Sequence, residues 1–222
     1  MQALDAQHHL HPFTDTRALN AKGTRVIKRA EGVYLWDSDG NRFLDGMAGL
    51  WCVNVGYGRR EILDAAYRQM EQLPYYNSFF QTSHPPAIEL AARIAEVTPD
   101  GFNRVFFCGS GSEANDTVVR MVRHYWAARG EPARQVIISR ENAYHGSTMA
   151  GASLGGMKPM HAQGGLPIAD IEHIMQPHWF KNGFDESPES FGRRAAQALE
   201  QRIEEIGADR CLLYTSPSPR DS

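Results

Sequence analysis

The chain has 222 residues, enough for one large domain or two small ones. Hydrophobic residues make up 42% and charged residues 22%, which is typical of a globular protein, and the formal net charge of −3 gives no indication of binding to nucleic acid or to an anionic membrane. Three cysteines without a C-x-x-C pair argue against a disulfide framework and predict a reducing, cytoplasmic location.

Residues 1–25 are polar and predict a flexible or docking arm at the N-terminus. They lack the apolar core of a secretory signal, and no apolar run in the chain approaches the roughly 20 residues that span a bilayer. His8, His9 and His11 cluster in the arm and could bind a metal. Because no helical or strand pattern fixes the three rings, an arm without a metal site is the favoured interpretation.

Residues 26–75 predict a segment that contains a β-hairpin and a helix. Asp39-Gly40 stands between two short β-prone runs within residues 32–46, and this dipeptide is a strong hairpin signal because both residues tolerate positive φ. The Gly- and aromatic-rich residues 47–58 predict an irregular loop. Residues 59–73 predict a helix whose apolar positions recur every three or four residues: Ile62, Leu63, Ala66 and Met70.

A second helix is predicted over residues 84–99, and the pattern then alternates between strand and helix. Residues 104–108 predict a short strand, and the helix after it ends near Gly130. Residues 135–139 predict a buried parallel strand, which completes a βαβ unit.

The rest of the chain is predicted to contain one clear helix. Residues 151–186 are rich in Gly and Pro and predict a long loop with little regular structure. The next helix is predicted to be capped by Ser187 and to end at Gly207. Beyond it only Cys211 to Tyr214 could form a strand, and the remaining composition is typical of disorder.

The sequence FFCGSGSEAND, residues 106–116, predicts an anion site between a strand and a helix. Small residues let backbone N–H groups converge on one point at a helix N-terminus. Gly109, Gly111 and Ala114 also fit the dinucleotide pattern G-x-G-x-x-G/A, and Arg140 could contact an NADP 2′-phosphate. A tight connection capped by serine, with no ligand, is the structural alternative.

A second group of residues, AYHGST at 143–148, follows the second strand of the βαβ unit. It is predicted to lie at the same edge of the sheet as the Gly-rich loop, where ligands of α/β proteins bind. Tyr144 would present an aromatic face there, and His145 a polar ring. An aromatic plate beside a phosphate site suits a flat phosphorylated heterocycle, although Tyr144 could also be an ordinary surface or core aromatic.

These stretches resemble the class III aminotransferases. The likeness is carried by FFCGSGSEANDTVVRMVRHYW, AYHGST and YLWDSDGNRFLDGMAGLWCVNVGYG, while YYNSFFQTSHPPAIELA and LGGMKPMHAQGGLP are similar to the ω-amino acid:pyruvate (ω-transaminase) branch. The resemblance covers about residues 10–210. It implies an α/β fold, the fold type I of pyridoxal phosphate (PLP)-dependent transferases, here truncated to a small-domain segment at 26–75 and the first part of a large mixed-sheet domain at 76–210.

The resemblance also implies roles for individual residues. Residues matching the family's cofactor-binding positions are Ser110, Gly111 and Ser112 at the phosphate, Tyr144 on the pyridine ring and its neighbour His145. Positions matching the substrate pocket are Phe13, Trp51 and Phe79, together with Tyr144. The implied reaction moves an amino group from an amine or ω-amino acid to a keto acid such as pyruvate, in a homodimer whose subunits share active sites.

No catalytic residue of that scheme is expected in this chain. The family's cofactor-bonding lysine, and the acid that contacts the pyridine nitrogen, match no residue here; none of Lys22, Lys28, Lys158 and Lys181 is predicted to end a strand beside the Gly-rich loop. We therefore expect an N-terminal fragment, inactive and poorly soluble by itself. Residues 211–222 resemble translated sequencing adapter and are expected to be a non-family tail.

Two other functions remain open at this point. One is an NADP-dependent oxidoreductase that uses the Gly109–Ala114 loop. The other is a non-catalytic chain that binds a phosphorylated ligand or a partner subunit. The sequence does not indicate which amine donor an aminotransferase of this kind prefers.

Overall fold

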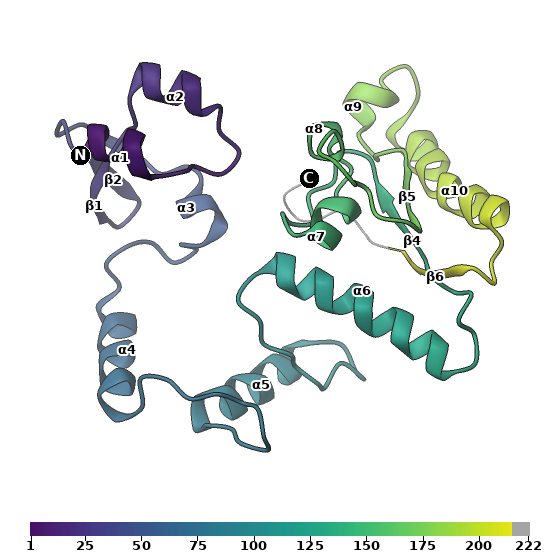
Figure 1. Ribbon diagram of the computed structural model, residues 1–222, viewed down its shortest axis with the longest axis horizontal. Coiled ribbons are helices and arrows are strands. Elements are labelled where there is room, and N and C mark those ends of the chain that lie inside the picture. Colours follow the sequence, from purple (N-terminus) through teal and green to yellow (C-terminus); the bar gives the residue numbers. More distant parts are fainter. Residues whose placement is uncertain (215–222) are drawn as a thin grey trace. The chain divides into compact units, whose positions relative to one another are not determined.

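The computed structural model describes residues 1–214 and divides into two compact units, Met1–Asn103 and Arg104–Ser222 (Figure 1). Each unit is described by itself below. The expected domain boundaries after residues 25 and 75 remain predictions. Most of the predicted tail, residues 215–222, lies outside the described residues.

The first unit opens with two short helices, α1 (Gln2–His8) and α2 (Thr16–Lys22), where the sequence indicates only a polar arm. Local hydrogen bonds stabilise these helices, and their sequences lack the apolar periodicity by which a helix is usually predicted. Asp15 caps α2 through its side chain, and Gln2 donates from Nε2 to the carbonyl of Thr24 at 2.8 Å. Both ends of the arm are therefore held together.

A three-stranded antiparallel sheet follows, in the order β1-β2-β3. Strands β2 (Tyr34–Asp37) and β3 (Arg42–Leu44) form the predicted hairpin around Asp39-Gly40, and Gly40 has the positive φ of +85° that the turn requires. Strand β1 (Ile27–Glu31) pairs with β2 and was missed, because its sequence IKRAE does not alternate between apolar and polar residues.

The residues after the sheet contain a left-handed turn, α3 (Ala48–Trp51), in place of the predicted irregular loop. All four residues have positive φ, from 47° to 68°. Asp45 holds the turn: its carboxylate accepts from the N–H of Gly49 at 2.7 Å and from the hydroxyl of Tyr57 at 2.7 Å. Left-handed geometry costs about 1–2 kcal/mol for each non-glycine residue, so this turn depends on such contacts.

Helices α4 (Arg60–Gln72) and α5 (Pro85–Val97) complete the first unit and confirm the two predicted helices. Prolines occupy the first turn of α5, as the sequence indicates. Neither helix contains a buried residue.

The second unit is built on a parallel sheet in the order β5-β4-β6. Its central strand β4 (Val136–Arg140) confirms the predicted strand and is buried at every position, as expected of a parallel strand with both faces covered. Its neighbours are β5 (Ile171–Ile174) and β6 (Cys211–Tyr214), so the four residues that could form a strand after the last helix do so.

Helices cover both faces of this sheet (Figure 1). The helices of the unit are α6 (Gly111–Ala128), α7 (Met149–Leu154), α8 (Lys158–His161), α9 (Trp179–Asn182) and α10 (Pro188–Ile206). One core cluster joins α6 and α7 to the sheet through Val119, Ile137, Ala150, Leu154 and Ile171. The other packs α10 against Val136, Ile138 and Ile174. The α/β fold class is therefore present in this unit.

Two predictions for the second unit were wrong. Residues 104–108 form no strand, because no described strand pairs with them, and Phe106 and Phe107 are exposed. Residues 151–186 are more regular than predicted and contain β5, the helices α8 and α9, and the end of α7. The glycines and prolines there separate short elements and do not prevent them. The predicted helix 187–207 is confirmed, with Ser187 as its cap and Gly207 at its end.

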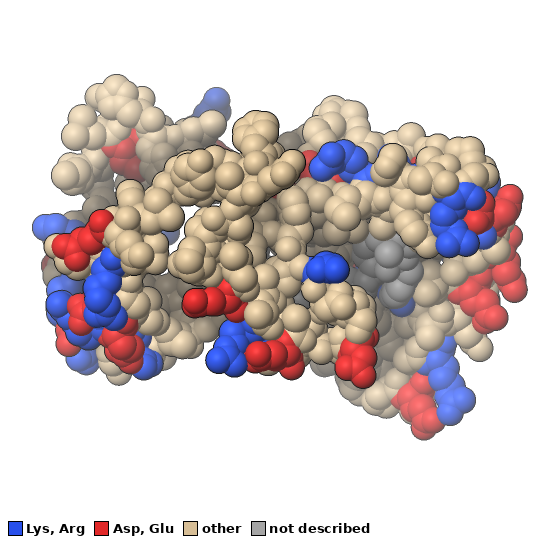
Figure 2. All heavy atoms as spheres, turned by 90° about the horizontal axis from the view of Figure 1, so that it is seen from below, with Lys and Arg blue, Asp and Glu red and all other residues tan. Residues whose placement is uncertain are grey.

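The described chain has no helix with the length and apolarity that a membrane crossing requires. On the face of the described residues drawn in Figure 2, basic and acidic side chains are interspersed, which agrees with the small net charge.

Candidate functional site

The loop before α6 and the loop after β4 meet and form a pocket in the second unit. Its volume is about 390 Å³, within the range of about 300–1,000 Å³ that is usual for small-molecule sites. The structure brings together all five residues predicted to bind the cofactor, and adds Asn115 and Gly146; the lining is Ser110, Gly111, Ser112, Asn115, Tyr144, His145 and Gly146. The two loops therefore meet as predicted, although the first does not follow a strand of the described sheet.

The first loop presents the N-terminus of α6 to the pocket. Ser110 is the N-cap: its Oγ accepts from the N–H of Glu113 at 3.2 Å, while the Glu113 carboxylate accepts from the N–H of Gly109 at 2.7 Å. Gly111 and Ser112 occupy the first two helical positions, whose N–H groups have no acceptor within the helix. These N–H groups and the Ser110 hydroxyl proton are donors suited to an anion.

The second loop is fitted against the first at a glycine. A Cβ placed on Gly146 would lie 2.5 Å from Oγ and 2.8 Å from Cα of Ser112, and Gly146 has a φ of +125°. The Ser112 hydroxyl also accepts from the N–H of Ser147 at 3.1 Å. The pocket therefore requires glycine at position 146 for both space and backbone conformation.

Two further side chains on α6 hold the second loop in place, and sequence reasoning missed both. Asn115 donates from Nδ2 to the carbonyl of His145 at 2.6 Å. Asp116 accepts from the hydroxyl of Thr148 at 2.6 Å and from the N–H of Gly151 at 3.1 Å, at the start of α7. The sequence feature that could have revealed them is the polar pair Asn115-Asp116 near the start of an otherwise amphipathic helix.

The donors and shape of the pocket fit a phosphorylated aromatic ligand. The helix N-terminus supplies N–H and hydroxyl donors for a phosphate, and the helix dipole favours its negative charge. Tyr144 and His145, both partly buried, supply aromatic rings to the same pocket. The pair of loops can therefore bind and orient such a ligand.

Arg140, which the sequence suggests as a partner for an NADP 2′-phosphate, has another role. Its guanidinium is buried and donates to the carbonyls of Met175 and Ala195 at 2.8 and 3.0 Å. It links the end of β4 to α10, so that expectation was wrong. None of the four lysines is among the described residues that line the pocket.

The three other residues predicted for the substrate pocket belong to the first unit. Phe13, Trp51 and Phe79 are all exposed there, and Trp51 lies in the left-handed turn. The structure thus brings Tyr144 together with the cofactor-binding group, and the aromatic wall made of Phe13, Trp51 and Phe79 remains a prediction.

Comparisons with known proteins agree on one family. The family profile described as aminotransferase class-III matches residues 17–208. Over 213 residues the chain is 63% identical to a putrescine–pyruvate aminotransferase of Pseudomonas aeruginosa. This alignment covers 96% of this chain and 47% of that protein. A diaminobutyrate–2-oxoglutarate transaminase of Halomonas elongata is 38% identical over 94% of this chain and 44% of its own length.

Solved structures show the same likeness. The ω-transaminase of Pseudomonas jessenii, crystallised with PMP, matches 96% of this chain and 48% of its own, with a TM-score of 0.93 and 40% identity. An (S)-enantioselective ω-transaminase of Thermomicrobium roseum matches with a TM-score of 0.91 and 40% identity, over 96% of this chain and 47% of its own. The chain therefore spans about half the length of the relatives it matches.

Proposed function

The chain belongs to the class III aminotransferases, a family of PLP-dependent enzymes of fold type I, and we propose that the protein it represents transfers amino groups from an amine or ω-amino acid to a keto acid such as pyruvate. The similarity to a putrescine–pyruvate aminotransferase supports a diamine as donor and pyruvate as acceptor. The observation that carries the proposal is the pocket in which the N-terminus of α6 faces Tyr144.

The residues of the pocket would divide the work of holding PLP. The N–H groups of Gly111 and Ser112 and the hydroxyl of Ser110 would bind the phosphate, because they converge where the helix dipole favours an anion. Tyr144 would lie against the pyridine ring and His145 beside it. Asn115 would keep the loop in register through its bond to the His145 carbonyl.

Bound PLP supplies an electron sink that makes the hydrogen on the donor's amine-bearing carbon acidic. This chain's own contribution is to anchor, orient and shield the ring. Phe13, Trp51 and Phe79 would form aromatic walls around the donor, in a homodimer whose subunits share active sites. A cytoplasmic location is part of the proposal, and all three cysteines are free thiols in the structure.

The proposal is tested by ligand binding to the 222-residue chain. The probe is pyridoxamine 5′-phosphate, which has no aldehyde and so cannot bond to a lysine. We expect saturable binding, measured by calorimetry, that is lost with pyridoxamine lacking the phosphate. Ser110→Ala should weaken it about tenfold, because it removes the hydroxyl that would donate to the charged phosphate. Ser190→Ala, on the exposed start of α10, is the matched control.

Equal binding of pyridoxamine with and without phosphate would contradict the phosphate assignment. So would binding of NADP in preference to pyridoxamine 5′-phosphate, which would revive the oxidoreductase alternative. Transfer itself is tested on the longer protein, as alanine formed from pyruvate and putrescine. Nothing in the comparisons favours the oxidoreductase or a non-catalytic binding chain.

A further inference from the structure

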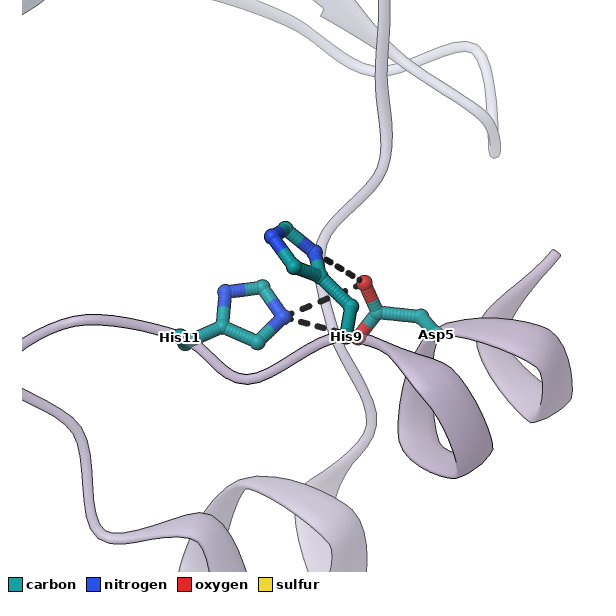
Figure 3. A group of neighbouring side chains, drawn as sticks. All are labelled: Asp5, His9 and His11. Atoms are coloured by element: carbon teal, nitrogen blue, oxygen red, sulfur yellow. Dashed lines mark hydrogen bonds and ion pairs between the residues drawn. The ribbon is translucent and has the colours of Figure 1, made fainter.

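A second cluster of ligand-type side chains lies in the first unit, at the end of α1. Asp5, His9 and His11 each offer one donor atom, and these atoms lie within 4.8 Å of one another. Figure 3 shows both imidazole rings turned toward the Asp5 carboxylate. His9 Nδ1 lies 3.1 Å from Oδ1 of Asp5, and His11 Nε2 lies 2.9 Å from Oδ2.

The local fold explains how three residues from a polar arm reach one point. Asp5 and His9 are four residues apart, so they share one side of α1 and its C-terminal cap. The chain then turns and returns His11 to the same carboxylate, with the two rings 4.2 Å apart between centroids. The sequence argued against a metal site because it predicted no helix or strand to hold the histidine rings. In the structure, α1 and the turn after it hold the His9 and His11 rings in place.

Asp5 is also fixed from outside the cluster. The hydroxyl of Thr24 donates to Oδ2 of Asp5, and Gln2 on the same helix donates to the carbonyl of Thr24. An oriented ligand with a hydrogen-bonded outer partner is typical of metal sites in proteins.

We propose that Asp5, His9 and His11 form a binding site for a Zn²⁺ ion. Two imidazole nitrogens and a carboxylate oxygen are ligands that Zn²⁺ commonly takes, with water in the fourth position. Zn–N and Zn–O distances of about 2.0–2.2 Å in a tetrahedron place neighbouring ligand atoms about 3.3–3.5 Å apart. His9 Nδ1 and His11 Nε2 each lie 3.1 Å from the same Oδ1 of Asp5, close to that separation, and the three ligand atoms all lie within 4.8 Å of one another.

The surroundings of the cluster suit such an ion. Asp5 and His11 are mostly covered, with 17% and 23% of their side chains exposed, whereas His9 is 62% exposed and leaves an entry path. A bound ion would fasten the end of α1 to the turn at His11 and, through Thr24, to the residues after α2. It would order the arm and take no part in amino transfer, so this proposal is independent of the proposed function.

The test uses the 222-residue chain with a C-terminal tag that contains no histidine. After treatment with a chelator and removal of the chelator, Zn²⁺ is titrated in competition with a chromophoric zinc indicator. We expect one ion per chain. His11→Gln should abolish saturable binding, and Thr24→Val should weaken it about tenfold, as loss of an outer hydrogen bond does in other metal sites. The matched control is His8→Gln, which changes the neighbouring histidine outside the cluster and should leave the affinity unchanged.

Cobalt provides a second readout that depends on ligand geometry. Co²⁺ in the chain should give visible absorption bands that His11→Gln removes and His8→Gln retains. If the chain aggregates, the same titrations on a C-terminal fusion to a soluble carrier keep the test decisive. Binding that is equal in the His8→Gln and His11→Gln variants, or no saturable uptake of Zn²⁺, would overturn the proposal.

Discussion

The two units of the chain differ in what holds them in shape. In residues 1–103, all of which the structure describes, Asp37 is the only buried residue, and it is a carboxylate that accepts hydrogen bonds from Asp39 and Asn41. In the second unit a parallel sheet is packed on both faces, and its central strand is buried throughout. Hydrogen bonds shape the first unit, and burial of apolar side chains shapes the second.

This difference indicates how much each unit depends on further protein surface. Helices α4 and α5 have 13 residues each, a length that is marginal for a helix alone in water, and both expose large apolar side chains. The chain spans about half the length of its relatives, and we expect α4 and α5 to gain stability when further protein surface covers their apolar side chains. The second unit already carries a core.

The largest effect should come from a cavity in that core. Ile137→Ala removes a side chain that is 0% exposed on β4 and should destabilise the second unit by about 2–5 kcal/mol, measured by urea unfolding. Ile62→Ala on α4 changes the same residue type at 52% exposure and should have an effect within about 0.5 kcal/mol. Equal changes in the free energy of unfolding for the two substitutions would contradict the view that apolar burial shapes the second unit but not the first.

The next effect concerns the pocket inside the second unit. Gly146→Ala places a Cβ against Ser112 at a positive φ, and such strain costs about 1–3 kcal/mol, so affinity for pyridoxamine 5′-phosphate should fall about 5- to 150-fold. Gly192→Ala is the control, because a Cβ there meets no atom within 4 Å and α10 tolerates alanine. Unchanged affinity in Gly146→Ala would show that the two loops are not locked together.

A smaller effect is expected at Asp116, which touches the pocket only through another loop. Asp116→Asn removes the charge that binds the Thr148 hydroxyl and the Gly151 N–H, at a cost of about 1 kcal/mol, or about fivefold in affinity for pyridoxamine 5′-phosphate. Since Asp116 acts by positioning, the variant should also speed hydrogen exchange of residues 144–151. Asp185→Asn, an exposed substitution in the same unit, should change neither quantity.

The smallest effect is a different response of the two units to acid. Burial, aided by the nearby His161, lowers the pKa of His173 below its usual 6.5, so its contribution to stability is present above pH 6.5 and is lost as the pH falls toward its folded pKa. In the first unit Asn41 lowers the pKa of Asp37 and Tyr57 lowers that of Asp45, both below 3.8. Their contributions are lost only as the pH falls below about 3.8.

Hydrogen exchange, corrected for its intrinsic dependence on pH, should therefore show the second unit loosening at a higher pH than the hairpin of the first. His173→Gln should remove the upper step, because its amide can still donate to the carbonyl of Gly155. Loosening of both units in one step near pH 4 would contradict this expectation.

Sequence patterns predicted best where a local signal decides the structure. Asp39-Gly40 indicated the hairpin, the prolines and Ser187 indicated helix starts, and the apolar run at 135–139 indicated the central strand. The five residues predicted to bind the cofactor line one pocket, because small residues before a helix and an aromatic after a strand are local features, and their contact with a cofactor stays a prediction.

What the sequence did not predict depends on partners distant in the chain. Strands β1 and β5 carry charged residues and become strands only through pairing with β2 and β4. Residues 104–108 carry a strand-like pattern without a described partner. Asp116 and Gly146 matter because of contacts with residues more than thirty positions away in the chain. His11 contacts Asp5 through a turn that the hydrophobic pattern of the sequence does not predict.

The bonds that join the two pocket loops connect residues far apart in the chain, which leads to an expectation about the order of folding. The bonds from Asn115 to His145, Ser147 to Ser112 and Thr148 to Asp116 close loops of 30, 35 and 32 residues. Such closures require α6 and β4 to dock first, because chain entropy is lost before these contacts form. We therefore expect the pocket to assemble after the folding transition state, so that a ligand bound there slows unfolding and leaves the folding rate almost unchanged.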